Sequence, residues 1–433
     1  MSAPNPREVV TTKALSIWVA AVLVYIVAIA GRTSFGVAGV DAIDRFGVTA
    51  SQIAVFTSVQ LGVYAFAQIP TGLLIDRFGP RKLLVVGAIV MGVGQVLLGF
   101  TSSYWVAIAA RVLIGAGDAT AFLSVMRILP YWFPLHRTPM FTQVTVSLGQ
   151  VGQFLSAVPF LWLLGYSGWT VAFVTLGAVG ILIGVAAAVA VADSPEKLGI
   201  FEPLSEQPGK SSASVGKQLA TVFRSPVAWQ AFFIHYIGML TPNVFIMLWG
   251  MPMMTQGMGI TPIHAGWVLT AYTVFIVLIG PLHGSISARA RGTRDWTAIV
   301  FALIHIVGWF VFFAFGTGLA SMLILIFVMA ACTPSSNYGF DIVREFLDRK
   351  VVATATGLGN MGGFISAMVG AQIFGIILDH RGSAPDYGFG DFRVASLAVL
   401  AIWTIGIVGV IITHILRARS GGTRPPVKVI EED

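Results

Sequence analysis

The sequence contains little charge and almost no cysteine. Only 10% of its 433 residues are charged while 56% are hydrophobic, and the mean hydropathy is +0.85, which excludes a set of soluble domains. The single cysteine, Cys332, lies in an apolar run, so a disulfide framework, a zinc cluster and dithiol chemistry are excluded as well. The net charge of +7 is scattered between hydrophobic stretches without a basic patch, so we expect no nucleic-acid partner.

The chain is made up mainly of long apolar stretches. About twelve of them are long enough to cross a hydrocarbon core, and none shows the alternation of a membrane β-barrel strand. We therefore predict an all-α polytopic membrane protein with twelve transmembrane helices. The predicted spans are residues 14–39, 51–75, 83–101, 104–130, 139–164, 169–192, 227–255, 262–288, 296–315, 319–343, 353–378 and 393–416.

The basic residues are distributed unequally between the two sides of these spans. Most of the 26 Lys and Arg residues fall in the two termini and in the loops on the same side, whereas Arg45, Arg381 and Arg393 fall on the opposite side. The positive-inside rule therefore places both termini in the cytoplasm. We expect an integral plasma-membrane protein, in a bacterium one of the cytoplasmic membrane. The first span is too long for a cleaved signal peptide.

The composition changes in the middle of the chain. Residues 193–226 are rich in Ser, Gly, Pro and charge and are interpreted as a cytoplasmic linker. The linker separates a six-helix N-terminal half, residues 1–192, from a six-helix C-terminal half, residues 227–433. The halves echo each other weakly, since Gly72–Lys82 corresponds to Gly284–Arg294. Two parallel halves are typical of transporters that bind substrate at the midplane and work by alternating access.

Two motifs carry a resemblance to a known family. The stretch Arg111–Gly115 in the fourth span and a pattern of glycines and charges between spans two and three are similar to signatures of the major facilitator superfamily. The loop residues of that pattern are Gly72, Asp76, Arg77, Gly79, Arg81 and Lys82. The resemblance extends over the whole chain and implies a secondary transporter, not an enzyme. The sequence has no phosphate-binding loop, and we expect no cofactor.

Within that superfamily the chain is most similar to the anion:cation symporters. The similarity rests on Arg32 in the first span, Asp118 in the fourth and the stretch Met126–Pro134. Family members often carry Asp just before the first-span Arg and Glu in the fourth span, where this sequence has Gly31 and Asp118. The resemblance implies uptake of a small organic anion, with a proton as the expected coupling ion.

Asp76 is predicted at the cytoplasmic end of span two, where span eleven also begins, at about Ala353. A carboxylate there would complement the N-terminus of that helix. We predict that the six loop residues named above form a cytoplasmic gate, which the second half would have in weaker form because Ala288 replaces the Asp. The alternative is that these charges only set the topology.

Among the nineteen acids only Asp118 falls near the middle of a span, and such a residue is functional by default. Arg111, Gly115 and Asp118 share one helix face because they lie at i, i+4 and i+7. A carboxylate whose surroundings change with conformation can take up and release a proton, so Asp118 and Arg111 are predicted to couple transport to protons. The alternative is a static Arg–Asp pair. Arg127, nearer the cytoplasm, is interpreted as a snorkelling end charge.

Arg32 lies in the outer half of span one without an acid within a turn of its own helix. A buried guanidinium needs an anion, which is either a substrate group or Asp118. Polar residues at similar depth are predicted to line a substrate cavity with Arg32, although each could instead make an interhelical hydrogen bond. These are Tyr64, Gln150, Asn243, Tyr272, Asn337 and Asn360. His235 and His305 are interpreted as core or cavity residues without metal-ligand spacing.

Three classes of function remain to be compared. The leading hypothesis is proton-coupled uptake of a small organic anion, and the main alternative is a proton-coupled exporter of drugs or metabolites. Such exporters usually carry Gly-Pro in span five, whereas here Pro159 is displaced. A sensor or membrane enzyme is disfavoured because no nucleophile and base pair is visible. The expected partners are the substrate, protons and the lipid bilayer, and we expect the protein to function as a monomer.

Overall fold

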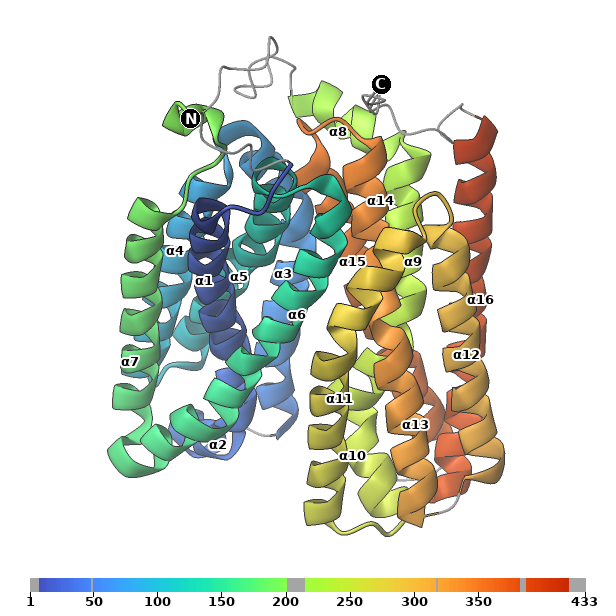
Figure 1. Cartoon of the computed structure of the whole chain (residues 1–433). Coiled ribbons are helices and arrows are strands. Elements are labelled where there is room, and N and C mark those ends of the chain that lie inside the picture. Colours follow the sequence, from blue (N-terminus) through green and yellow to red (C-terminus); the bar gives the residue numbers. More distant parts are fainter. Residues whose placement is uncertain (1–7, 48–49, 201–214, 317, 382–386, 420–433) are drawn as a thin grey trace. The chain divides into compact units, whose positions relative to one another are not determined.

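The computed structural model describes residues 8–47, 50–200, 215–316, 318–381 and 387–419. Over these residues the chain is helical and contains no strand (Figure 1). The chain folds into two compact units. The first unit extends to Val222 and includes Asp348–Gly357, and the second comprises Phe223–Leu347 and the chain from Leu358 onwards.

The first unit is built around α4, which packs against both α5 and α7, while α1 packs against α5, α6 and α7 (Figure 1). Small residues allow these close contacts: a Cβ on Gly117 of α5 would lie 2.4 Å from the carbonyl oxygen of Gly87 on α4. The helical elements of this unit are α1 (Thr12–Val37), α2 (Gly39–Phe46), α3 (Ala50–Phe78), α4 (Pro80–Phe100), α5 (Tyr104–Trp132), η1 (Leu135–Arg137), α6 (Thr138–Leu155), η2 (Ser156–Phe160), α7 (Leu161–Ala190), η3 (Glu196–Leu198) and α8 (Val215–Phe223).

In the second unit α9 packs against α14 and α16, α11 against α13, and α12 against α13 and α16. The helix α15 is divided between the two units. Its first residues, from Val352 to Gly357, belong to the first unit, and the rest of the helix belongs to the second. The elements are α9 (Pro226–Val244), η4 (Phe245–Trp249), α10 (Gly250–Pro252), η5 (Met253–Gly257), α11 (Pro262–Arg289), α12 (Arg294–Phe315), α13 (Gly318–Cys332), η6 (Thr333–Asn337), α14 (Tyr338–Phe346), α15 (Val352–Arg381) and α16 (Phe389–Arg419).

Ten helical stretches of the described chain are long and apolar enough to cross a membrane. One of them, Leu135–Ala190, contains both spans predicted between residues 139 and 192. Inside it Gly168 has φ +79°, which breaks the helical geometry of α7 at the predicted boundary and suits a residue without a Cβ. The span predicted at 227–255 is not among the ten. The structure therefore confirms an all-helical fold with several helices that could span a membrane, and the number twelve stays a prediction.

Three of the predicted spans contain segments that are not α-helical. The π-helical segment Ser156–Phe160 interrupts span five, two further π-helical segments interrupt span seven, and the 3-10 segment Thr333–Asn337 interrupts span ten. Pro159 and Pro334 lie within two of these segments. Proline lacks an N–H group and its ring clashes with the preceding turn, so regular α-helical bonding cannot continue there.

Candidate functional site

The centre of the first unit holds a buried ion pair between α1 and α5. Arg32 donates from Nε to Oδ2 of Asp118 at 2.6 Å and from Nη2 to Oδ1 at 3.0 Å. The Asp118 side chain is fully buried, while that of Arg32 retains 18% exposure. Of the two anions predicted for Arg32, the structure shows Asp118. The partner of Asp118 in the pair is accordingly Arg32 rather than Arg111.

One aromatic ring contacts this pair, and a second lies on the same helix as Arg32. The Cζ atom of Arg32 lies 4.3 Å from the centre of the Tyr64 ring on α3, and Tyr64 is buried. Tyr25, two turns before Arg32 on α1, packs against Phe122 with ring centres 5.6 Å apart. A ring face attracts a cation, most strongly where water is excluded. The predicted neighbours Arg32 and Tyr64 are thus together, and Gln150 on α6 is half-buried.

Arg111 lies near the pair, on the α5 face that also carries Asp118, and is only 1% exposed. Its Cζ atom is 4.6 Å from the centre of the Phe35 ring. Within the described part of the chain, its Nε and Nη1 atoms have no hydrogen-bond partner. The side chain of Gln60 on α3, likewise buried, also has neither polar atom paired there. Gln60 was not predicted, since an uncharged polar residue in a span gives no distinctive signal.

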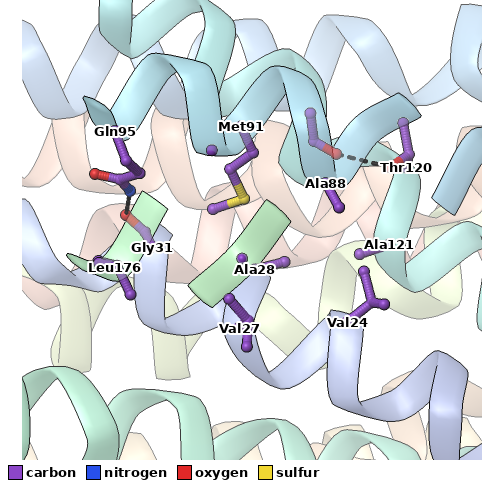
Figure 2. Close-up of a pocket in the computed structure, with 13 residues that line it drawn as sticks. Val24, Val27, Ala28, Gly31, Ala88, Met91, Gln95, Thr120, Ala121 and Leu176 are labelled. Carbon is purple, nitrogen blue, oxygen red and sulfur yellow. Dashed lines mark hydrogen bonds between the residues drawn. The ribbon is translucent and has the colours of Figure 1, made fainter. Parts of the chain in front are cut away.

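A small cavity lies behind the ion pair, between α1, α4, α5 and α7 (Figure 2). Its volume of about 20 Å³ is room for one water molecule. Figure 2 shows Gln95 of α4 reaching the backbone of Gly31, where its Nε2 atom donates to the carbonyl oxygen at 2.9 Å. Gly31 and Gly117, which line this cavity, precede Arg32 and Asp118. The mainly apolar lining fits a packing space better than a substrate site.

Asp76 makes the contacts that a helix N-terminus requires. Its Oδ1 accepts from the backbone N–H of Ala353 at 3.0 Å, and its Oδ2 accepts from the N–H and the hydroxyl of Thr354 at 2.8 and 2.7 Å. Gly72, one turn earlier, allows close approach, since a Cβ there would lie 2.6 Å from the Ala353 carbonyl oxygen. All of these residues belong to the first unit.

The interpretation of Arg127 as a snorkelling end charge is wrong. Arg127 is buried, and its Nε donates to Oδ1 of Asp76 at 3.2 Å. Its Cζ atom also lies 4.3 Å from the ring centre of Tyr131. The physical reason is that the end of α3 brings a carboxylate to α5, and a buried pair is more stable than a lone buried charge.

The remaining loop residues of the predicted gate divide into two kinds. The backbone N–H of Arg81 donates to Asp193 at 2.9 Å, and its Nε donates to the carbonyl oxygen of Ala188 at 2.7 Å. Gly79 has φ +90° and a Cβ there would lie 2.6 Å from the same Asp193 carboxylate. These contacts join the start of α4 to the end of α7. Arg77 and Lys82 are exposed.

In the second unit two acids of α14 bind residues in and beside the segment that repeats the loop motif. Ser287, beside Ala288, donates to Asp341 at 2.6 Å, and Asp341 also pairs with Arg344. Glu345 pairs with Arg294 and, at 2.7 Å, with Arg291. The repeat of the loop motif is thus accompanied by carboxylates supplied from a different helix.

Polar residues of the second unit gather at the 3-10 break in span ten. Tyr272 donates to the Thr333 hydroxyl at 3.3 Å, and Nδ1 of His235 lies 3.2 Å from the Ser336 carbonyl oxygen. Asn337 and Asn360 are both buried, whereas Asn243 is half-buried. The break frees backbone groups for such contacts, and its sequence signal is the run Thr-Pro-Ser-Ser-Asn.

Three histidines are buried in this unit. Two of them, His235 and His305, were expected inside the spans, and His283 was not. His235 and His305 are confirmed as core residues, and His305 bonds to the Thr241 hydroxyl at 2.7 Å. His283 lies between the Tyr338 hydroxyl and the Ala331 carbonyl oxygen, each at 2.7 Å. Among the residues with described positions, no group of three potential metal ligands comes together.

Comparison with known proteins gives a consistent result. A family model described as the Major Facilitator Superfamily matches residues 21–251. A probable sulfoacetate transporter of Cupriavidus necator is 32% identical over 175 residues, which are 40% of this chain and 41% of that protein. A putative tartrate transporter of Agrobacterium vitis is 24% identical over 94% of each chain. The solved structure of a proton:xylose symporter, 14% identical, shares the fold with a TM-score of 0.70 over 92% of this chain and 95% of that one.

Proposed function

The chain belongs to the Major Facilitator Superfamily, and we propose that it is a twelve-helix transporter that takes up a small organic anion together with a proton. Membership makes it a multi-pass membrane transporter rather than an enzyme. The anionic substrate is supported by two relatives, a probable sulfoacetate transporter and a putative tartrate transporter. Both termini are proposed to lie in the cytoplasm, and the halves 1–192 and 227–433 to alternate access by rocking about the linker 193–226.

The observation that carries the proposal is the bidentate pair of Arg32 and Asp118. The planar guanidinium fork of Arg32 fits one carboxylate at a time in this geometry. When Asp118 takes up a proton, it loses the charge that holds Arg32, and an anionic group of the substrate can replace it. Loss of the substrate would return Arg32 to Asp118 and expel the proton. Uptake of anion and proton would thereby be linked through one shared side chain.

Other residues complete the proposed site. Tyr64 holds Arg32 against its ring, and Arg111 keeps a second positive charge on the helix that carries Asp118, which favours release of the proton. Hydroxyl or other polar groups of the substrate would be bound by uncharged residues. These are Gln150, Asn243, Tyr272, Asn337 and Asn360.

A ligand screen tests this function. The purified protein would be heated with organic acids, sugar acids, amino acids and cationic drugs, because a ligand that binds only the folded state raises the melting temperature. We expect organic anions to stabilise it, and Arg32→Lys to lose about 1.5–3 kcal/mol of affinity because Lys lacks the planar fork. Stabilisation by cations, or wild-type affinity in Arg32→Ala, would refute the anion site. Accumulation of substrate inside vesicles with an acidic interior, in exchange for the protons that leave, would favour the exporter instead.

A further inference from the structure

The buried charges around the ion pair do not balance. The described parts of α1 and α5 carry three charged residues away from the helix ends. These are two cations, Arg32 and Arg111, and one anion, Asp118. When Asp118 is ionised, one positive charge is left over. When it is protonated, two are left over. Uncompensated charge at this depth is costly, so an anion from outside the chain is the natural counterpart.

Arg111 is the cation without a counterpart. Its Nε and Nη1 atoms find no hydrogen-bond acceptor among the residues described, although the side chain is buried. Its Cζ atom lies 4.6 Å from the centre of the Phe35 ring, which holds the guanidinium in place. Phe35 follows Arg32 by three residues on α1, so the two guanidinium groups border the same turn of that helix. A small ligand at that turn is within reach of both.

Gln60 adds a second, independent group that lacks a partner. It is 1% exposed, and neither its amide nitrogen nor its amide oxygen is hydrogen-bonded within the described chain. Its Cγ atom lies 3.3 Å from the position of a Cβ on Gly115. Gly115 stands between Arg111 and Asp118 on the same face of α5. Buried amide and guanidinium groups are normally hydrogen-bonded. Here Nε and Nη1 of Arg111 and the Gln60 amide nitrogen lack an acceptor, and the Gln60 amide oxygen lacks a donor, among the residues described.

From these groups we infer that the substrate is a small dianion, with one anionic group bound by Arg32 and the other by Arg111 and Gln60. The inference rests on the proposed function and specifies its substrate class. Arg32 becomes available when Asp118 is protonated, and Arg111 is available throughout. The two guanidinium groups then meet two negative charges, and the occupied site is neutral. Carboxylate and sulfonate groups both supply the oxygen acceptors that this arrangement requires.

Matched pairs of ligands test the inference. Binding of succinate and malonate would be measured by calorimetry against succinamate and malonamate, in which an amide replaces one carboxylate with nearly the same shape. We expect the wild-type protein to bind the dianion of each pair at least about tenfold more tightly, the effect of one charged hydrogen-bonded contact. Arg111→Gln should remove this preference, so that the two members of each pair bind with affinities within about twofold of each other.

Further variants keep the test decisive if Arg111→Gln does not fold. Arg111→Lys retains the charge and should retain the preference, and Gln60→Leu should reduce it. Arg45→Gln is the matched control, because Arg45 donates to the carbonyl oxygens of Gly99 and Thr101 at the end of α4, away from the ion pair. Equal affinity for both members of each pair, or a preference that persists in Arg111→Gln, would overturn the dianion. Failure of every anion to bind would instead refute the proposed function.

Discussion

The proposed cycle requires Asp118 and Arg32 to exchange one interaction for another when the carboxyl group is protonated. The ionised carboxylate accepts two hydrogen bonds from the guanidinium, and charged hydrogen bonds of this kind contribute about 1.5–3 kcal/mol each. Protonation weakens both. A substrate anion that could not displace Asp118 in its ionised state could therefore compete for Arg32 once the proton is bound, and two side chains would suffice for the proposed coupling.

Replacement of Asp118 by Asn tests this exchange. Asn has nearly the size of the protonated acid and the same lack of charge, so Asp118→Asn should abolish uptake driven by a pH gradient in proteoliposomes. Exchange of labelled for unlabelled substrate without a gradient should continue, because it requires no release of the proton. Asp391→Asn, which alters an acid paired with the exposed Arg381 outside the predicted spans, serves as the control.

Two other outcomes would assign Asp118 differently. Full accumulation on a pH gradient by a well-folded Asp118→Asn protein would exclude it as the proton carrier. Equal loss of accumulation and exchange, together with a lower melting temperature, would indicate that the pair with Arg32 is purely structural, since an unpaired buried arginine destabilises the fold.

For single residues, the sequence indicated which charged side chains are buried more readily than which partner each of them binds. Asp118 could be predicted because an acid inside an apolar run is conspicuous, and Arg32 because a buried cation needs an anion. Arg127 was misinterpreted, since its position along α5 says nothing about the carboxylate that α3 brings to it. Gln60 was missed because most uncharged polar residues in spans make ordinary interhelical hydrogen bonds.

The first turn of α15 is held by a carboxylate from another helix. Asp76 accepts from two backbone N–H groups that a helix N-terminus leaves unpaired, and its charge also complements the helix dipole. Arg127 bonds the same carboxylate from α5. The side chain thus joins α3, α5 and α15 at one point, and the cytoplasmic gate stays a prediction.

We expect Asp76→Asn to loosen the start of α15. The amide keeps one acceptor but loses the charge and one oxygen, a loss of about 1–2 kcal/mol or roughly tenfold in a local opening equilibrium. The measurement is the rate at which a thiol reagent labels Thr356→Cys, a fully buried position, after Cys332→Ser removes the native cysteine. Unchanged labelling would leave Asp76 a topology-setting charge.

Arg77→Gln is the matched control for this measurement. Arg77 follows Asp76 in the chain but is exposed, so its removal should leave the labelling rate of Thr356→Cys unchanged. A comparable increase in both variants would mean that net charge in the loop, rather than the contact made by Asp76, governs access to α15.

The elements themselves were largely predictable, and their interruptions were not. Hydropathy averaged over a span located the helices to within a few residues, as for α12 at Arg294–Phe315 against a prediction of 296–315. The same averaging conceals a π-helical or 3-10 turn, because Pro159 and Pro334 lie in stretches that remain strongly apolar. The Thr-Pro-Ser-Ser-Asn run was the available signal for the 3-10 segment in span ten.

Across the described molecule Asp118 is the one carboxylate remote from helix ends. The other buried acids lie near a terminus of their helix and have basic partners there: Asp76 with Arg127, Asp295 with Arg417, Asp341 with Arg344 and Glu345 with Arg294. A transport cycle that uses Asp118 alone moves one proton with each substrate. For a dianionic substrate the complex then crosses the membrane with one net negative charge.

Transport of a dianion should therefore respond to membrane potential. One charge moved through 100 mV corresponds to about 2.3 kcal/mol, or about 50-fold in the accumulation ratio at equilibrium. At a fixed pH gradient, proteoliposomes clamped with potassium and valinomycin should accumulate succinate more strongly when the interior is positive and less when it is negative. Succinamate, with one charge fewer, serves as the internal control and should accumulate independently of potential. Accumulation of succinate that ignores the potential would require a second proton, and hence a carrier other than Asp118.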